Sequence, residues 1–216
     1  VYNEQDCLPE LLERLRASCP GANVIFVDNA STDRTVELLE AAPDVQLVRH
    51  AENLGYGQSL IDGIRAGHAS CVVMIDADLE YQPEDIPAVV AALAEADAVY
   101  GSRFLGVQAN PDGMNWRRTR GNRLITALFN GLYGQQLTDI YTGIRGFRRS
   151  ALALDDYRRT GFDFIVELSS LAALRGARFT EVPAEYRLRS TGTSKMRHLQ
   201  ELAKFVFWVI RDRFRR

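Results

Sequence analysis

Short apolar segments alternate with segments of helical spacing along the first half of the chain, and this alternation restricts the fold more than any other feature. The apolar segments lack the polar–apolar alternation of half-exposed strands, so we expect buried strands with helices on both sides. The pattern predicts strands at 24–27, 45–48, 71–75 and 98–100, and helices at 8–16, 33–41, 57–66 and 83–95. It therefore predicts an α/β fold, in which a parallel sheet is covered on both faces.

The second half of the chain has longer helical segments and more arginine. It predicts helices at 116–133, 162–174 and 196–215, and one further strand at 179–182. In the first half, Ser31 or Thr32 is expected to cap the helix at 33–41.

Size and composition exclude several classes of protein. The chain has 216 residues, 46% of them hydrophobic, which suffices for one globular domain with or without an appendage. A net charge of −2 argues against a nucleic-acid partner. Three cysteines are too few for a disulfide framework, which favours a reducing compartment. The chain lacks an initiator Met and stops inside a basic run, so we expect the natural protein to extend at one or both ends.

Asp76-Ala77-Asp78 directly follows the apolar segment at 71–75. Ligands of such folds bind at the carboxyl ends of the strands, where Asp28 also falls. Two carboxylates at positions i and i+2 can share a divalent cation, and hard oxygen ligands suit Mg²⁺ or Mn²⁺, which can also hold a diphosphate. The motif is short, however, and a strand-terminal turn with solvated acids would have the same sequence.

Other common sites are excluded. Gly55-Tyr56-Gly57 lacks the third glycine of a dinucleotide fingerprint, because Leu60 stands at that position. The acids from Asp76 to Glu80 do not continue as a calcium loop. The three histidines have no zinc spacing, and no Ser or Cys stands in a nucleophile-elbow sequence. What remains is a candidate metal, a diphosphate-sized site and a group of arginines that could bind phosphate.

These residues together resemble the family 2 glycosyltransferases of GT-A fold, and within them the dolichol-phosphate mannosyltransferase-like branch, whose members form polyprenyl-phosphate sugars. The resemblance covers essentially the whole chain. It is carried by eight segments in the same order: Val1-Tyr2-Asn3-Glu4, residues 27–33, residues 53–57, Asp76-Ala77-Asp78-Leu79-Glu80, Gly101-Ser102-Arg103-Phe104, residues 139–145, Glu181-Val182-Pro183 and residues 190–195. The family's usual Gly-Phe-Arg is Gly143-Ile144-Arg145 here, and the residues around Arg118 align poorly with the family pattern.

The resemblance implies a role for each matching residue. The fold would be a Rossmann-like, mostly parallel sheet forming one catalytic domain over 1–195, with a donor half at 1–104 and an acceptor half at 105–195. The implied groups are these: nucleotide-sugar binding by Tyr2, Glu4, Asp28, Asp76, Ala77 and Asp78; a Mg²⁺ or Mn²⁺ ion at Asp76, Asp78 and Glu80; acceptor-phosphate binding by Arg103, Arg118, Arg189 and Lys195; catalysis by Asp78 and Arg103.

The implied reaction moves a hexose from a nucleotide-diphosphate sugar, of the GDP-mannose or UDP-glucose class, to a polyprenyl or dolichyl phosphate with inversion. A phosphate is already largely dianionic near pH 7, so this reaction needs no strong general base. A family 2 enzyme with a soluble or glycan acceptor would need a carboxylate base, for which Asp139 and Glu167 are the candidates. A metal-dependent nucleotidyltransferase is less favoured, because its Gly-rich basic loop is missing. A non-catalytic nucleotide-binding module is disfavoured by the presence of both Asp76 and Asp78.

The last predicted helix, within residues 196–216, is basic and amphipathic. From Lys195 to Arg216 there are seven Lys or Arg and two acids. One interpretation places the apolar side of this helix toward lipid and its basic residues toward anionic headgroups, at the cytoplasmic face of a membrane. The other packs the same apolar side on the protein. We expect both to contribute, and a homo-oligomer remains open. The apolar side comprises Leu199, Leu202, Phe205, Val206 and Val209.

Overall fold

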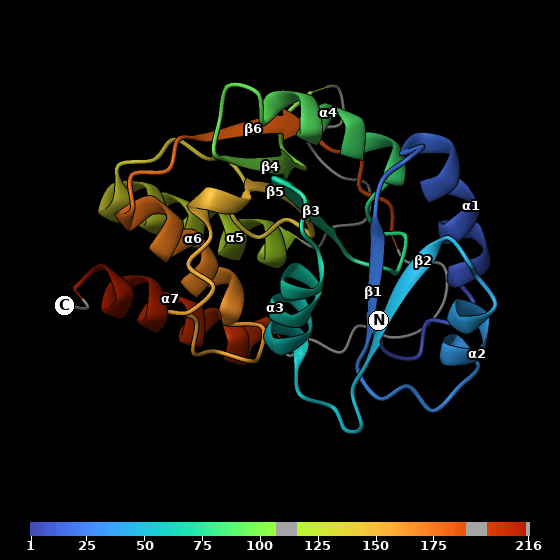
Figure 1. Cartoon of the computed structure of the whole chain (residues 1–216). Coiled ribbons are helices and arrows are strands. Elements are labelled where there is room, and N and C mark those ends of the chain that lie inside the picture. Colours follow the sequence, from blue (N-terminus) through green and yellow to red (C-terminus); the bar gives the residue numbers. More distant parts are fainter. Residues whose placement is uncertain (107–115, 189–197, 215–216) are drawn as a thin grey trace.

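The structure, a computed structural model, describes residues 1–106, 116–188 and 198–214, and for residues 116–118 and 198–202 it describes the backbone alone. Helices and strands alternate along the described residues up to 92, as expected from the sequence (Figure 1). The helices are α1 (Leu8–Ser18), α2 (Thr35–Glu40), α3 (Tyr56–Ala66), α4 (Ile86–Ala92), α5 (Trp116–Tyr133), α6 (Phe164–Leu174) and α7 (His198–Arg213). The strands are β1 (Val24–Asp28), β2 (Val45–Arg49), β3 (Cys71–Ile75), β4 (Ala98–Ser102), β5 (Ile144–Arg148) and β6 (Phe179–Pro183).

The described strands form two sheets. β1 and β2 pair in parallel, with Val24 opposite Val45. The larger sheet has the order β3-β5-β4-β6, and β4 and β6 are parallel. β5 runs antiparallel to both of its neighbours, so this sheet is mixed rather than parallel throughout. The α/β class is confirmed, and among the strands of the described residues β5 is the one that the sequence analysis missed.

The composition of β5 explains why it was missed. Arg145 and Gly146 interrupt its apolar residues, which removes the pattern of a buried strand. Gly146 is needed where it stands, because a Cβ there would lie 2.5 Å from Cγ1 of Val89 on α4. The strand is therefore defined by how closely α4 packs on it rather than by its own hydrophobicity.

Both faces of the larger sheet are covered, as predicted. On one face, Val89 of α4 and Leu93, which directly follows this helix, pack on Val99 and Ile144 of the sheet. On the other face, Tyr100 and its neighbours pack against α5 and α6, which lie with α7 on the side of the molecule away from α1 and α2 (Figure 1). Burying these apolar side chains contributes about 25 cal/mol per Å² removed from water, so the two faces are the main source of stability.

The expected N-cap of α2 is wrong. The helix begins at Thr35, later than predicted, and neither Ser31 nor Thr32 caps it. Instead, Oδ1 of Asp33 accepts a hydrogen bond from the backbone N–H of Thr35 at 2.9 Å. Oδ2 of Asp33 accepts one from the N–H of Gln5 at 3.2 Å, so this carboxylate also ties the N-terminal segment to α2.

The C-terminal helix α7 packs on α5 and α6. Phe205 and Val209 from its predicted apolar side are fully buried, and the hydroxyl of Tyr133 on α5 donates to the carbonyl of Val209 at 3.0 Å. The interpretation that turned these two residues toward lipid is therefore wrong, since they belong to the protein core. Leu199 and Leu202 lie among the residues whose side chains are not described.

Candidate active site

Asp28 is the last residue of β1 and is 2% exposed. Its Oδ2 accepts a hydrogen bond from the N–H of Ser31 at 3.1 Å, but its Oδ1 has no hydrogen-bond partner among the described residues. A buried carboxylate oxygen without a donor is costly, because it has lost its hydration. This oxygen is suited to accept a hydrogen bond from a bound ligand at the end of β1.

Asp76 directly follows β3 and is held by a tyrosine from α3. The hydroxyl of Tyr56 donates to Oδ1 of Asp76 at 2.9 Å. Burial and the negative charge of Asp78 raise the pKa of Asp76 to about 7, although the Tyr56 hydrogen bond and the charge of Arg145 act in the opposite direction. Asp76 and Asp78 are therefore close enough to repel each other, and a cation between them would relieve this repulsion.

The carboxylate of Asp78 turns partly toward its own loop. Its Oδ1 accepts a hydrogen bond from the N–H of Glu80 at 3.1 Å, and Leu79 between them has a positive φ of 59°. Within the described ranges, no three His, Cys, Asp or Glu side chains are grouped in a way that could hold a metal ion. The donor set of Asp76 and Asp78 fits Mg²⁺ or Mn²⁺ by its chemistry, whereas the third ligand, Glu80, stays a prediction.

The raised pKa of Asp76 predicts a pH dependence of stability. Between about pH 4 and pH 7 the native state keeps a proton that the unfolded state has released, so the free energy of unfolding falls as pH rises. We expect the metal-free protein to lose more stability between pH 4.5 and pH 8 (roughly the two ends of this window) than the variant Asp76→Asn. Urea unfolding in the presence of a chelator measures this, and equal losses in the two proteins would refute the assignment.

Arg103 is bound to Asp139 rather than free in the site. Its Nε and Nη2 donate to the two carboxylate oxygens of Asp139 at 2.7 and 2.9 Å, and Nη2 also donates to the carbonyl of Tyr141. The Arg103 side chain is 10% exposed and that of Asp139 is 0% exposed. Burial raises the pKa of Asp139, but the charge and hydrogen bonds of Arg103 outweigh burial and hold this pKa below its ordinary value. Asp139 is therefore a poor proton acceptor.

The other predicted site residues lie in different surroundings. Glu4 is buried, and its backbone N–H donates to Oγ1 of Thr35 at 2.9 Å. Tyr2 and Ala77 are partly buried, and Ala77 packs against the core between α1 and β1. The side chain of Arg118, like Arg189 and Lys195, lies outside the described residues. The structure brings Asp76 and Asp78 together directly after β3, and it places Asp28 at the end of β1, a strand of the other sheet.

Three residues of this region were missed by the sequence analysis. Tyr56 binds Asp76, as described above. Arg145 on β5 is 1% exposed, and its guanidinium nitrogens have no hydrogen-bond partner among the described residues. Gly143 lies against Asp76, because a Cβ at this position would be 2.5 Å from Oδ2 of Asp76. Tyr56 falls in residues 53–57, and Gly143 and Arg145 fall in residues 139–145. Both segments carry the family resemblance, which was the available signal for these residues.

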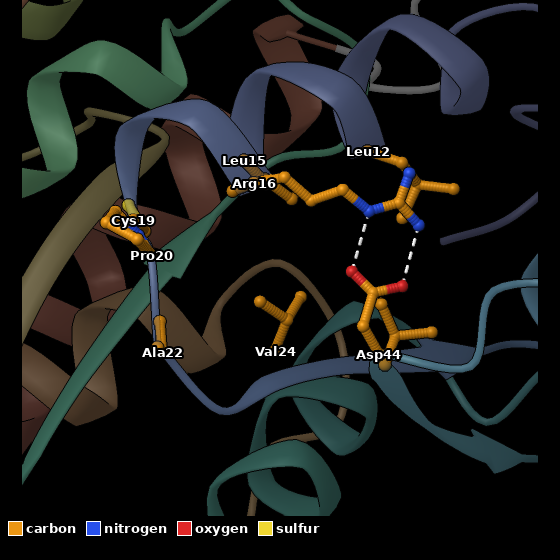
Figure 2. A pocket seen from close by; sticks show the side chains of 10 residues that line it. Leu12, Leu15, Arg16, Cys19, Pro20, Ala22, Val24 and Asp44 are labelled. Carbon is orange, nitrogen blue, oxygen red and sulfur yellow. Dashed lines mark hydrogen bonds and ion pairs between the residues drawn. The ribbon is translucent and has the colours of Figure 1, made fainter.

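A cavity of about 230 Å³ lies elsewhere (Figure 2). It is lined by Leu15 of α1 and by Val24 and Val45, the first residues of β1 and β2. Arg16 and Asp44 form an ion pair at its side. Because β1 and β2 are parallel, the cavity is at their amino ends, opposite the end that carries Asp28. It is therefore not part of the candidate active site.

Comparison with known proteins gives relatives over nearly the whole chain. An undecaprenyl-phosphate mannosyltransferase of Micrococcus luteus is 34% identical, over 91% of this chain and 84% of that protein. A polyprenol monophosphomannose synthase of Mycolicibacterium smegmatis is 31% identical, over 100% of this chain and 87% of that protein. An undecaprenyl-phosphate 4-deoxy-4-formamido-L-arabinose transferase of Edwardsiella ictaluri is 32% identical, but the chain spans only 60% of its length.

Solved structures share the fold. A mannosyltransferase of Pyrobaculum calidifontis, in complex with GDP-Man and Mn²⁺, superposes with a TM-score of 0.63 at 22% identity, over 89% of this chain and 56% of that one. Glucosyl-3-phosphoglycerate synthase of Mycobacterium tuberculosis, with Mn²⁺, UDP-glucose and phosphoglyceric acid, gives a TM-score of 0.70 at 19% identity, over 99% of this chain and 77% of that one. The family model described as glycosyl transferase family 2 matches residues 1–154. With this match and the relatives above, the chain belongs to glycosyl transferase family 2.

Proposed function

We propose that this protein transfers a hexose from a nucleotide-diphosphate sugar, of the GDP-mannose or UDP-glucose class, to a polyprenyl phosphate with inversion at the anomeric carbon. The names of the relatives from Micrococcus luteus and Mycolicibacterium smegmatis support the acceptor class. In this proposal residues 1–104 hold the donor, and residues 105–195 receive the acceptor.

The hydrogen bonds of the two candidate bases, Asp139 and Glu167, support the choice of a phosphate acceptor. Asp139 is saturated by Arg103 and by the side-chain amide of Asn122, which donates at 2.7 Å. Glu167 is 1% exposed, and its Oε2 accepts hydrogen bonds from the N–H groups of Arg158 and Arg159, both at 2.9 Å. A hydroxyl acceptor needs a base that can take its proton, whereas a phosphate dianion does not. The described residues therefore favour a phosphate acceptor over a soluble or glycan one.

Each group of residues in the site would then have a separate role. Asp28 would accept a hydrogen bond from the nucleoside, and Tyr2 and Glu4 lie on the segment that packs beside it. Asp76 and Asp78, with Glu80 as a further ligand, would hold Mg²⁺ or Mn²⁺, which supplies Lewis-acid stabilisation of the leaving nucleoside diphosphate. Arg103, kept charged and oriented by Asp139, would attract the acceptor phosphate together with Arg118, Arg189 and Lys195.

A donor and acceptor screen tests the proposal. Purified protein is incubated with Mn²⁺, a short polyprenyl phosphate or a panel of soluble glycans, and either GDP-mannose or UDP-glucose, and products are read by mass spectrometry. We expect a lipid-linked monophosphate sugar from one donor and none with the glycan panel. Transfer to a glycan but not to the lipid phosphate would overturn the proposed acceptor.

A lipid acceptor also calls for contact with a membrane surface. Among the described residues, no helix combines the length and the apolar character that spanning a bilayer requires. One face of α7, continued by the residue that follows it, instead exposes Phe207, Ile210 and Phe214, which are 55%, 42% and 71% exposed and are spaced as on one side of a helix. Arg211 and Arg213, also exposed, flank this face and complement an anionic lipid surface. We place this face at the cytoplasmic surface of a membrane.

Liposome flotation tests the membrane contact. Replacing Phe207, Ile210 and Phe214 together with serine should abolish flotation with anionic liposomes, because it removes the exposed apolar face while leaving the buried Phe205 and Val209 in place. The matched control replaces Leu54, Val90 and Leu174, which are exposed outside α7, with serine, and it should float like the unmodified protein. Equal flotation of both variants would remove the membrane role from α7.

A further inference from the structure

Residues 158–163, which we call the linking segment, lie between the C-terminal helix and the N-terminus of α3. The carbonyl of Thr160 accepts hydrogen bonds from the N–H groups of Gly57 and Gln58 at 2.7 and 3.2 Å. A Cβ at Gly55 would lie 2.4 Å from this carbonyl oxygen, and Gly55 has a φ of +96°. The two glycines beside Tyr56 thus let the linking segment approach α3 closely. The N–H groups of Gly57 and Gln58, in the first turn of α3, are therefore already hydrogen-bonded within the protein.

The linking segment is fixed to α7 by Arg159. The Arg159 side chain is 8% exposed, and its Nη1 donates to Oδ2 of Asp212 at 2.6 Å, while Nη2 binds the other carboxylate oxygen. The guanidinium carbon lies 3.9 Å from the ring centroid of Trp208, also on α7. A bidentate pair that is also stacked on an aromatic ring fixes the guanidinium in position and direction.

The other end of the linking segment reaches the candidate active site. The ring of Phe162 stacks on that of Tyr56, with centroids 5.0 Å apart and planes inclined by 22°. Tyr56 in turn donates its hydroxyl to Asp76. A continuous set of packed and hydrogen-bonded groups therefore runs from Asp212 on α7 to the carboxylate of Asp76.

We propose that Tyr56 is a positioning residue for Asp76, and that the linking segment makes this position depend on how α7 is docked. The inference rests on the proposed function, because it assigns Asp76 to the donor's cation. The C-terminal helix would then do more than contact lipid: loosening it would move Phe162, and with it the tyrosine that orients the carboxylate. Contiguity alone does not establish coupling, so the test must measure it.

A double-mutant cycle of Tyr56→Phe and Asp212→Asn measures the coupling. The affinity for Mn²⁺ in the presence of GDP or UDP is followed by the electron paramagnetic resonance signal of free Mn²⁺. Loss of the Tyr56 hydroxyl should weaken this affinity about tenfold, as expected for a hydrogen bond to a charged group. Asp212→Asn should weaken it about fivefold. If Asp212 acts through Tyr56, the double variant should bind Mn²⁺ no more weakly than Tyr56→Phe alone. The decreases in thermal midpoint of the two single variants should instead add.

The proposal would be overturned if the double variant lost Mn²⁺ affinity by the product of the two single losses, or if Asp212→Asn bound Mn²⁺ as tightly as the unmodified protein. Arg159→Lys keeps the charge but loses the bidentate pair, and it serves in the same cycle should Asp212→Asn fail to fold. The matched control is Asp156→Asn, whose carboxylate is 54% exposed and pairs with Arg175; it should change nothing.

A second readout separates this inference from the proposed function, because it requires neither metal nor substrate. In protein labelled with fluorotyrosine, the ¹⁹F resonance of Tyr56, assigned by its loss in Tyr56→Phe, should shift in Asp212→Asn and stay in place in Asp156→Asn. An unmoved resonance overturns the inference even if lipid-linked product is found. A shifted resonance supports it even if the screen of acceptors yields no lipid-linked product.

Discussion

Replacing Asp78 with alanine is expected to lower the rate of sugar transfer by at least about 10³-fold, because metal-ion stabilisation of a leaving group is worth several kcal/mol and each 1.4 kcal/mol is tenfold in rate. The fold should survive. The side chain of Asp78 makes a local hydrogen bond to the N–H of Glu80, and it sits in a loop rather than in the core. Initial rates with the donor and acceptor found in the screen, together with the thermal midpoint, measure both effects.

The control for this variant is Asp44→Ala. Asp44 is an aspartate at the opposite end of the strands, in an ion pair with Arg16 whose side chains are 49% and 46% exposed. It should transfer sugar at the normal rate. Near-normal transfer by Asp78→Ala, or equal losses in the two variants, would contradict the role given to Asp78.

Replacing Asp139 with alanine is expected to lower the free energy of unfolding by about 3–5 kcal/mol, because it leaves the buried guanidinium of Arg103 without its counter-ion. Asn122 and the N–H of Tyr141 also lose their acceptor. The double variant Arg103→Met with Asp139→Leu should recover most of this stability, since well-packed apolar residues often replace a buried ion pair at little cost. Urea unfolding measures the free energies.

The exposed pair of Arg175 and Asp156 is the control for Asp139, and Asp156→Ala should cost less than about 1 kcal/mol. Initial rates of sugar transfer by Asp139→Ala, measured beside its stability, separate the two acceptor classes. If Asp139→Ala kept normal stability but lost transfer, Asp139 would be acting as a base, and the family 2 reaction on a hydroxyl acceptor would be favoured instead.

The sequence was sufficient wherever a segment's own pattern decides its structure. The apolar segments up to Ile75 are strands, and the helix predicted at 116–133 has those bounds in α5. The position of Asp76 at the end of β3 follows from the same pattern. In each of these cases the signal is local hydrophobic periodicity, which survives without knowledge of the neighbours.

The missed features all depend on contacts between distant parts of the chain. β5 is a strand because α4 and two neighbouring strands surround it, although its own residues include Arg145 and Gly146. Gly55 and Gly57 do not belong to a nucleotide-binding fingerprint. They are explained only by the close approach of residues 159–160, which leaves no room for a Cβ at either position. Phe205 and Val209, from the apolar side predicted for α7, are buried in the protein, but an apolar side does not by itself say whether protein or lipid covers it.

The most direct test of the account is a crystal structure of the protein grown with Mn²⁺ and either GDP or UDP, in which anomalous scattering locates the ion. We expect one Mn²⁺ ion bound by carboxylate oxygens of Asp76 and Asp78 and by the diphosphate of the nucleotide. An ion on the diphosphate that neither carboxylate touches, or a nucleotide bound away from the ends of β1 and β3, would contradict it.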